Sequence, residues 1–193
     1  VVEQPQRLDA FQRDPQRHLE TLLAAMQVRT QIENAAHRYA AVQASAEEWI
    51  AALERHGRAR TRQMVSALSQ LADAHNFLNH PDETYQTARR AYELALELFP
   101  QGDSHQAVNS ARVFYARALE QRDELDAAAD LMRETQRSAA AAYGADGRQA
   151  GWYSGVMTPS LANAGYAKEA RAASLHAMKV VGPTLAPDSM AYA

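Results

Sequence analysis

The sequence contains no cysteine, which excludes disulfide bonds, thiol nucleophiles and cysteine-ligated zinc sites together. Glycine and proline are scarce, with 8 and 7 residues among 193, so few positions break a regular backbone. Aromatic residues make up only 7% of the chain, and alanine dominates the apolar positions. This mixture favours closely packed α-helices over pleated sheets.

A strong charge of one sign and long apolar runs are also missing. The formal net charge of −3 gives no broad positive field, so we expect no direct binding to nucleic acid. No apolar run approaches the roughly 20 residues that span a bilayer, which predicts no membrane contact for this segment. We expect a cytoplasmic location and leave the periplasm open. Because the chain begins with Val1 and not with methionine, we expect it to be part of a longer protein.

Local signals near the start predict a polar segment followed by helices. Asp14 and Pro15 form a typical helix start, with aspartate as N-cap and proline at the first helical position. Thr30 and Ser45 each precede a glutamate by three residues, the pattern of a capping box, so two or three helices are predicted before Gly57. After Gly57, turns at proline and glycine separate helices whose apolar residues recur every three or four positions.

The helices after Gly57 form pairs that repeat. Ala128 and Ala170 are 42 residues apart (170 − 128), and residues 143–146 (Tyr-Gly-Ala-Asp) return at the same interval as residues 185–188 (Leu-Ala-Pro-Asp). Several matches at one offset and in one helix–turn–helix phase indicate a structural repeat. The predicted segments are 1–14 (polar), 15–59 (helical N-terminal region or degenerate repeat) and three helix pairs at 60–102, 103–146 and 147–188, followed by the start of a further helix.

These repeats resemble the tetratricopeptide family, in the kinesin-light-chain-like form whose units have about 42 residues and occur in many bacterial signalling proteins. Leu71 and Ala72 match the family's pair on the first helix, and Ala128 and Ala170 match its second-helix alanine. The resemblance covers about residues 60–193, with Pro159 as a departure inside a first helix. It implies an all-α fold of antiparallel helix hairpins stacked in a right-handed superhelix, a TPR-like α-solenoid.

The resemblance also implies that the first helix of each pair lines a groove for a partner. The residues that it places there are Ser66, Ser69, Gln70, Asp73, Asn76, Val113, Phe114, Arg117, Glu120, Trp152 and Val156. Phe114 and Trp152 would anchor an apolar side chain of the partner. The alternative is that both aromatic residues belong to the core, which the usual burial of large aromatic side chains favours.

Patterns for catalysis, cofactors and metals are weak. The 7 histidines include no His-Glu-x-x-His, and we interpret them as structural or surface residues. Residues 151–155 (Gly-Trp-Tyr-Ser-Gly) have the wrong spacing for a serine nucleophile elbow, and no glycine-rich phosphate loop occurs. We interpret the basic run at residues 55–62 as a solvated loop whose arginines meet nearby acids. We therefore expect no enzyme, no metal and no cofactor.

Two hypotheses for function remain. The first is a scaffold that binds a protein or peptide, serving as the regulatory or sensory part of a larger bacterial signalling protein, where the signalling role is implied by the resemblance alone. The second is an oligomerisation or small-ligand-sensing helical segment of an enzyme or transcription regulator whose active part lies outside this chain. A homo-oligomer through the repeat ends stays open under either hypothesis, because the last unit lacks a polar capping helix.

Overall fold

The computed structural model describes residues 15–100 and 106–184, and it is helical throughout apart from short turns. These described ranges contain no β-strand, so the prediction of an all-α fold is confirmed. The predicted polar segment 1–14, the N-cap at Asp14, the helix start near residues 103–104 and the closing turn at 185–188 lie outside the described residues.

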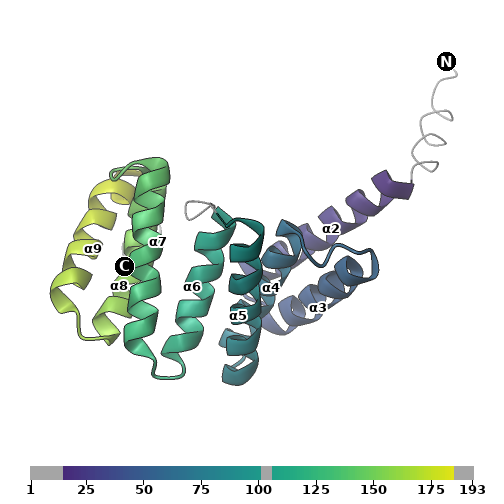
Figure 1. Ribbon diagram of the computed structural model, residues 1–193, viewed down its shortest axis with the longest axis horizontal. Coiled ribbons are helices and arrows are strands. Elements are labelled where there is room, and N and C mark those ends of the chain that lie inside the picture. The colour runs from purple at the N-terminus through teal and green to yellow at the C-terminus, as the bar shows by residue number, and fades with distance from the viewer. Residues whose placement is uncertain (1–14, 101–105, 185–193) are drawn as a thin grey trace, which may run out of the picture.

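Consecutive helices pack as antiparallel hairpins that stand side by side in chain order (Figure 1). The helices are α2 (Pro15–Ala35), α3 (Tyr39–Arg55), α4 (Arg62–Phe77), α5 (Pro81–Leu98), α6 (Gln106–Glu120), α7 (Leu125–Tyr143), α8 (Arg148–Asn163) and α9 (Ala167–Val181), with a 3₁₀ turn η1 (Gly182–Thr184) at the end. The hairpins are α2/α3, α4/α5, α6/α7 and α8/α9. The architecture is an all-α helical-repeat fold.

Each hairpin turns on one residue in the left-handed region of backbone space, which we call its turn residue. The turn residues are His37 (φ 54°), Asn79 (φ 60°), Asp123 (φ 63°) and Gly165 (φ 83°). They are separated by 42, 44 and 42 residues (79 − 37, 123 − 79, 165 − 123). In each turn the next residue donates its N–H to the carbonyl five residues back, as Tyr166 does to Leu161 at 2.8 Å. This is a hydrogen bond typical of a Schellman helix end.

The first hairpin, α2/α3, has the same turn as the other three. Arg38 donates its N–H to the carbonyl of Glu33 at 3.0 Å, and His37 donates to Asn34 at 2.8 Å. All four hairpins of the described residues therefore share one turn geometry.

Two helix starts that the sequence suggested are wrong. The capping-box patterns at Thr30 and Ser45 fall inside α2 and α3, which run through them without a break. The hydroxyl of Thr30 donates to the carbonyl of Met26 at 3.0 Å, and that of Ser45 donates to Val42 at 3.2 Å. Both side chains are buried and bond their own helix, so their hydroxyls do not cap a new one.

One position of the second helices is buried in every hairpin. Val42, Thr84, Ala128 and Ala170 each follow their turn residue by five positions (42 − 37, 84 − 79, 128 − 123, 170 − 165) and are buried. Ala72 and Ala116 are buried on the first helices. A larger side chain at these positions would force the helices apart.

The first helices of the hairpins form an inner layer and the second helices form an outer layer. The backbones of α2 and α4, of α4 and α6, and of α6 and α8 lie in contact. In the described residues the backbones of α3, α5, α7 and α9 do not contact one another, and these helices are linked by side-chain ion pairs such as Arg90 with Glu54 and Arg133 with Glu169. The stack therefore packs more densely on the side of α2, α4, α6 and α8.

The turn geometry predicts opposite effects of substitutions at two equivalent turn residues. A Cβ at Gly165 would meet no atom within 4 Å, so Gly165→Ala adds only the cost of a left-handed alanine, and we expect it to lower the free energy of unfolding by about 1 kcal/mol. Asp123→Gly relieves the same cost and should leave stability unchanged or raise it. Urea unfolding measures both, and equal losses for the two variants would contradict a shared turn.

Candidate partner-binding face

One carboxylate joins three consecutive hairpins on the side of the first helices. Asp73 of α4 accepts a hydrogen bond from Asn34 of α2 at 3.3 Å and one from Arg117 of α6 at 3.5 Å. Asn34 also donates to Gln70 at 2.7 Å. Polar side chains from α2, α4 and α6 thus form a continuous network along the inner layer.

The network continues beyond Asp73 with further polar and aromatic groups. Gln121, just after α6, donates to the side chain of Asn76 on α4 at 2.8 Å. The guanidinium of Arg117 lies over the ring of Phe114, 5.8 Å from its centroid. We call the surface that carries these groups the first-helix face. Its members are Asn34, Gln70, Asp73, Asn76, Phe114, Arg117, Gln121, Trp152 and Val156.

The Asp73 carboxyl is a buried acid in this network. Burial raises its pKa above the ordinary value for aspartate, while the positive charge of Arg117 and the hydrogen bond from Asn34 act in the opposite direction. Arg117 itself is partly exposed, so its guanidinium lies between the Asp73 carboxylate and solvent. Asp73 is therefore held in place by its neighbours and has little access to solvent.

The structure brings most of the predicted groove residues to this face. Gln70, Asp73, Asn76 and Arg117 lie in the polar network described above. Four more predicted groove residues are half-buried and lie outside that hydrogen-bond network: Ser66, Phe114, Glu120 and Val156.

The two predicted aromatic anchors differ in exposure. Trp152 on α8 is 50% exposed and contacts Tyr153 edge-on, with 4.8 Å between ring centroids. Phe114 packs partly against the buried Ala72 and Ala88. Trp152 is therefore not a core residue, unlike in the alternative that assigns both aromatic residues to the core.

Two predicted residues, Ser69 and Val113, do not reach the face. The hydroxyl of Ser69 donates to the carbonyl of Val65 at 2.8 Å, and Val113 packs in the core with Ala116 and Leu119. Both lie ten residues before their turn residue (79 − 69, 123 − 113), a position that points toward the second helices. The first-helix face instead contains the residues that lie six and nine positions before the turn residue.

Sequence reasoning missed several residues on the same side of the molecule. Asn34 was not considered because α2 matches the repeat pattern poorly, and Gln121 lies one residue beyond its helix. Phe77 at the end of α4 is exposed and stacks on Tyr39, with 4.0 Å between ring centroids. Counting back from the turn residue would have found Phe77 and Gln121, which share one position (79 − 77, 123 − 121).

Two hollows open on the outer side of the stack. One of about 670 Å³ lies over α6 and α7, and one of about 380 Å³ lies between α3 and α5 above α4. Several charged groups on their rims already have partners: Glu134 pairs with Arg112 at 2.7 Å, and Glu54 pairs with Arg90 at 2.9 Å. These hollows follow from the spacing of the outer layer.

A serine, a histidine and an aspartate line up between α8 and α9. The Ser154 hydroxyl lies 2.8 Å from Nδ1 of His176, whose Nε2 lies 3.8 Å from Asp146. Ser154 is buried, and its hydroxyl also lies within donating distance of the carbonyl of Ala150 at 3.0 Å. A nucleophile must be reachable by its substrate, so we interpret this arrangement as packing.

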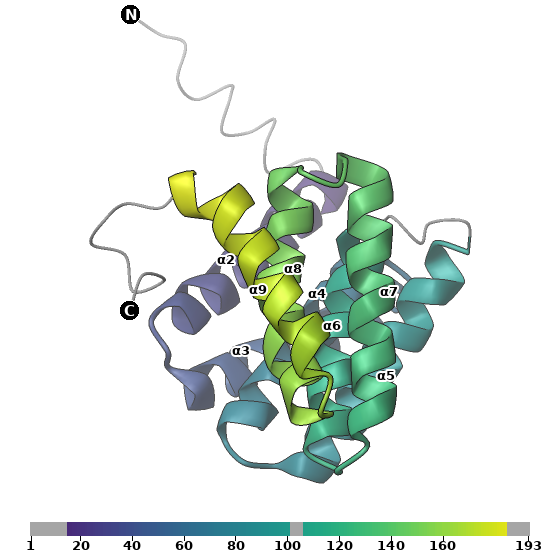
Figure 2. The same cartoon turned by 90° about the vertical axis from the view of Figure 1, so that its left-hand side faces the viewer.

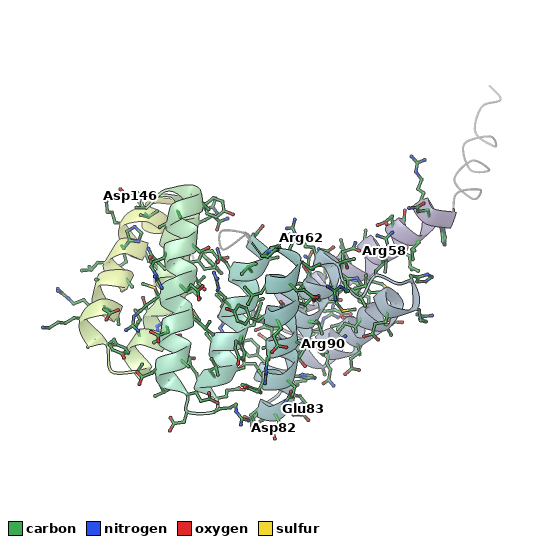
Figure 3. The ribbon with its side chains drawn as sticks, viewed as in Figure 1. Arg58, Arg62, Asp82, Glu83, Arg90 and Asp146 are labelled. Atoms are coloured by element: carbon green, nitrogen blue, oxygen red, sulfur yellow. The ribbon has the colours of Figure 1, made fainter. Side chains whose placement is uncertain are left out.

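The histidines and the basic run also take structural positions. The rings of His75 and His80 lie 6.0 Å apart, and the described residues hold no group of three or more side chains that could bind a metal ion. Arg58 pairs with Glu20 at 2.5 Å and Arg60 pairs with Glu97, which confirms that these arginines meet nearby acids; Figure 3 shows Arg58 and Arg62 around the α3–α4 connection. None of the described helices is long and apolar enough to cross a membrane.

Comparison with solved structures places the fold. The chain is similar to the crystal structure of BtubC (BKLC) from P. vanneervenii, with a TM-score of 0.72 and 12% sequence identity over 92% of this chain and 71% of that one. At this identity the likeness shows the fold alone, a TPR-like helical repeat. No protein-family model and no curated protein sequence matches the chain.

The buried carboxyl predicts a pH effect with a definite sign. Because the pKa of Asp73 is higher in the folded than in the unfolded chain, its contribution to stability falls as pH rises from the ordinary aspartate value of about 3.9 through the raised value. NMR titration should give Asp73 a midpoint above that value, and Arg117→Ala should raise it further because a favourable positive charge is removed. A midpoint at or below about 3.9 would contradict the burial argument. The Asp73→Asn variant lacks the carboxyl, so the signal that it loses is the resonance of Asp73.

Proposed function

We propose that this chain is a scaffold module that binds a protein or peptide partner along the first-helix face and has no catalytic activity of its own. The observation that carries the proposal is the polar network around Asp73 beside the exposed ring of Trp152. Side chains fixed on rigid helices can meet a partner with little loss of conformational entropy.

The chemistry of the face suits a peptide ligand. Asn76 and Gln121 present amide groups that can exchange their mutual hydrogen bond for bonds to a peptide backbone. Arg117, partly exposed, offers a positive charge next to the ring of Phe114. Trp152 supplies the large apolar contact that often dominates binding energy at an interface.

We further propose that this module is the regulatory or sensory part of a larger bacterial signalling protein in the cytoplasm. The support for this is the resemblance to kinesin-light-chain-like repeats at about residues 60–193. The competing hypothesis, a small-ligand sensor, would need an enclosed apolar cavity with a few convergent polar groups. The two outer hollows are open and edged by paired charges, so they do not favour it.

Selection of peptides from a displayed random library, followed by titration, tests the binding face. We expect Trp152→Ala and Arg117→Ala each to weaken the selected peptides by about 10- to 30-fold, the range of an interface hot spot. Arg89→Ala is the matched control, because Arg89 lies exposed on the outer helix α5 and pairs only with Glu93 of its own helix at 2.8 Å. The proposed face would be refuted if Arg89→Ala weakened the binding of the selected peptides and the two face variants did not.

A further inference from the structure

The first helix, α2, carries exposed apolar residues beside the stripe that it packs in the core. On its inner side, Leu19, Leu23 and Met26 pack in the core. On its outer side, Leu22 is 43% exposed and Ile32 is 58% exposed. A helix of a globular protein normally buries the whole width of its apolar stripe.

The other hairpins show how this outer side is covered in the stack. Ile32 lies five residues before its turn residue (37 − 32), and the residues at the same position in the other hairpins are Ala74, Ala118 and Ser160. Leu22 lies fifteen residues before its turn residue (37 − 22), and the equivalent residues are Met64, Val108 and Ala150. All six equivalents are buried. Only in α2 is this surface open.

The element that buries these positions is the second helix of the preceding hairpin. Trp49 and Ile50 of α3 share a core cluster with Met64 of α4, and Ala95 of α5 shares it with Val108 of α6. α7 packs on α8 in the same order. In the described residues no second helix precedes α2, so its outer side lacks the element that the repeat places there.

The opposite end of the stack has the complementary opening. Met178 of α9 is 66% exposed and lies thirteen residues after its turn residue (178 − 165), where the first hairpin has the buried Ile50 (50 − 37). Leu175 on the same helix is also exposed. Figure 2 looks onto this end and shows α9 in front, with no helix covering it. In the described residues, α9 is thus a second helix with no following first helix packed on its outer side.

We propose that a second copy of this chain joins the two ends: the outer side of α9 in one copy packs on the outer side of α2 in the next. This contact continues the series α3/α4, α5/α6 and α7/α8, in which a second helix always covers the following first helix. The two surfaces are different halves of one interface, so the contact is head-to-tail and does not close on itself in a dimer. Copies therefore assemble into stacks whose length grows with concentration.

Solution mass as a function of concentration tests this inference on the full chain. Wild type should rise above the monomer mass of 21.3 kDa as concentration increases, when followed by sedimentation or light scattering. Ile32→Glu closes the α2 end and Met178→Glu closes the α9 end, because each puts a charge into the apolar contact. Each variant alone should stay monomeric, whereas an equimolar mixture should form dimers and nothing larger.

Val28→Glu is the matched control, because it puts the same charge on the same helix at another exposed position. Val28 is 52% exposed but lies nine residues before the turn residue (37 − 28), the position of Gln70 and Phe114 on the first-helix face. We expect this variant to associate as wild type does. Circular dichroism checks that every variant keeps its helix content, and Leu22→Lys with Met178→Lys forms a second pair with charges of the opposite sign.

Three results would overturn the inference. One is a wild-type chain that is monomeric at every concentration. Another is a Met178→Glu variant that dimerises on its own, which would show a symmetric contact between two α2 helices. The last is a mixture of the two end variants that stays monomeric. None of these results bears on peptide binding at the first-helix face, so the two proposals can fail separately.

Discussion

A single left-handed residue between the two helices of each hairpin sets the register on which the rest of the structure depends. It reverses the chain within a few residues, so the second helix returns along the first at a fixed offset. The same positions counted from that residue are then buried in hairpin after hairpin, whether the side chain is Val42, Thr84, Ala128 or Ala170. Turn geometry thus carries the repeat even where the amino acids differ.

The sequence predicted the features that depend on periodicity. The helix pairs and the burial of Ala128 and Ala170 follow from the 42-residue offset. The repeat of the first hairpin was harder to recognise, because His37 occupies a position where glycine, asparagine or aspartate is the usual signal. Ser69 was misplaced because a serine that bonds its own helix looks, in sequence, the same as one that faces a partner.

Some polar groups lie where sequence reasoning expects apolar ones. Arg112 of α6 is fully buried, pairs with Glu134 of α7 and donates to Asn109 at 3.2 Å. Ser138 of α7 donates to the same Asn109 oxygen at 2.9 Å. Such a network adds little net stability compared with apolar packing, but its hydrogen bonds between α6 and α7 form only when the two helices meet at one register. Its partners are 22 to 29 residues apart in the chain, so no local pattern reveals them.

The unequal spacing of the two helix layers has a mechanical consequence. The inner helices touch each other and are tied by hydrogen bonds through Asp73, while the outer helices α3 and α5 are separated by open volume and bridged by the ion pair of Arg90 with Glu54. Bending that draws α3 and α5 together has free space to close, whereas bending in the opposite direction must compress inner helices that already touch. The stack is therefore softer toward straightening than toward tighter coiling, and a guest on its inner surface would change its curvature more easily by flattening it.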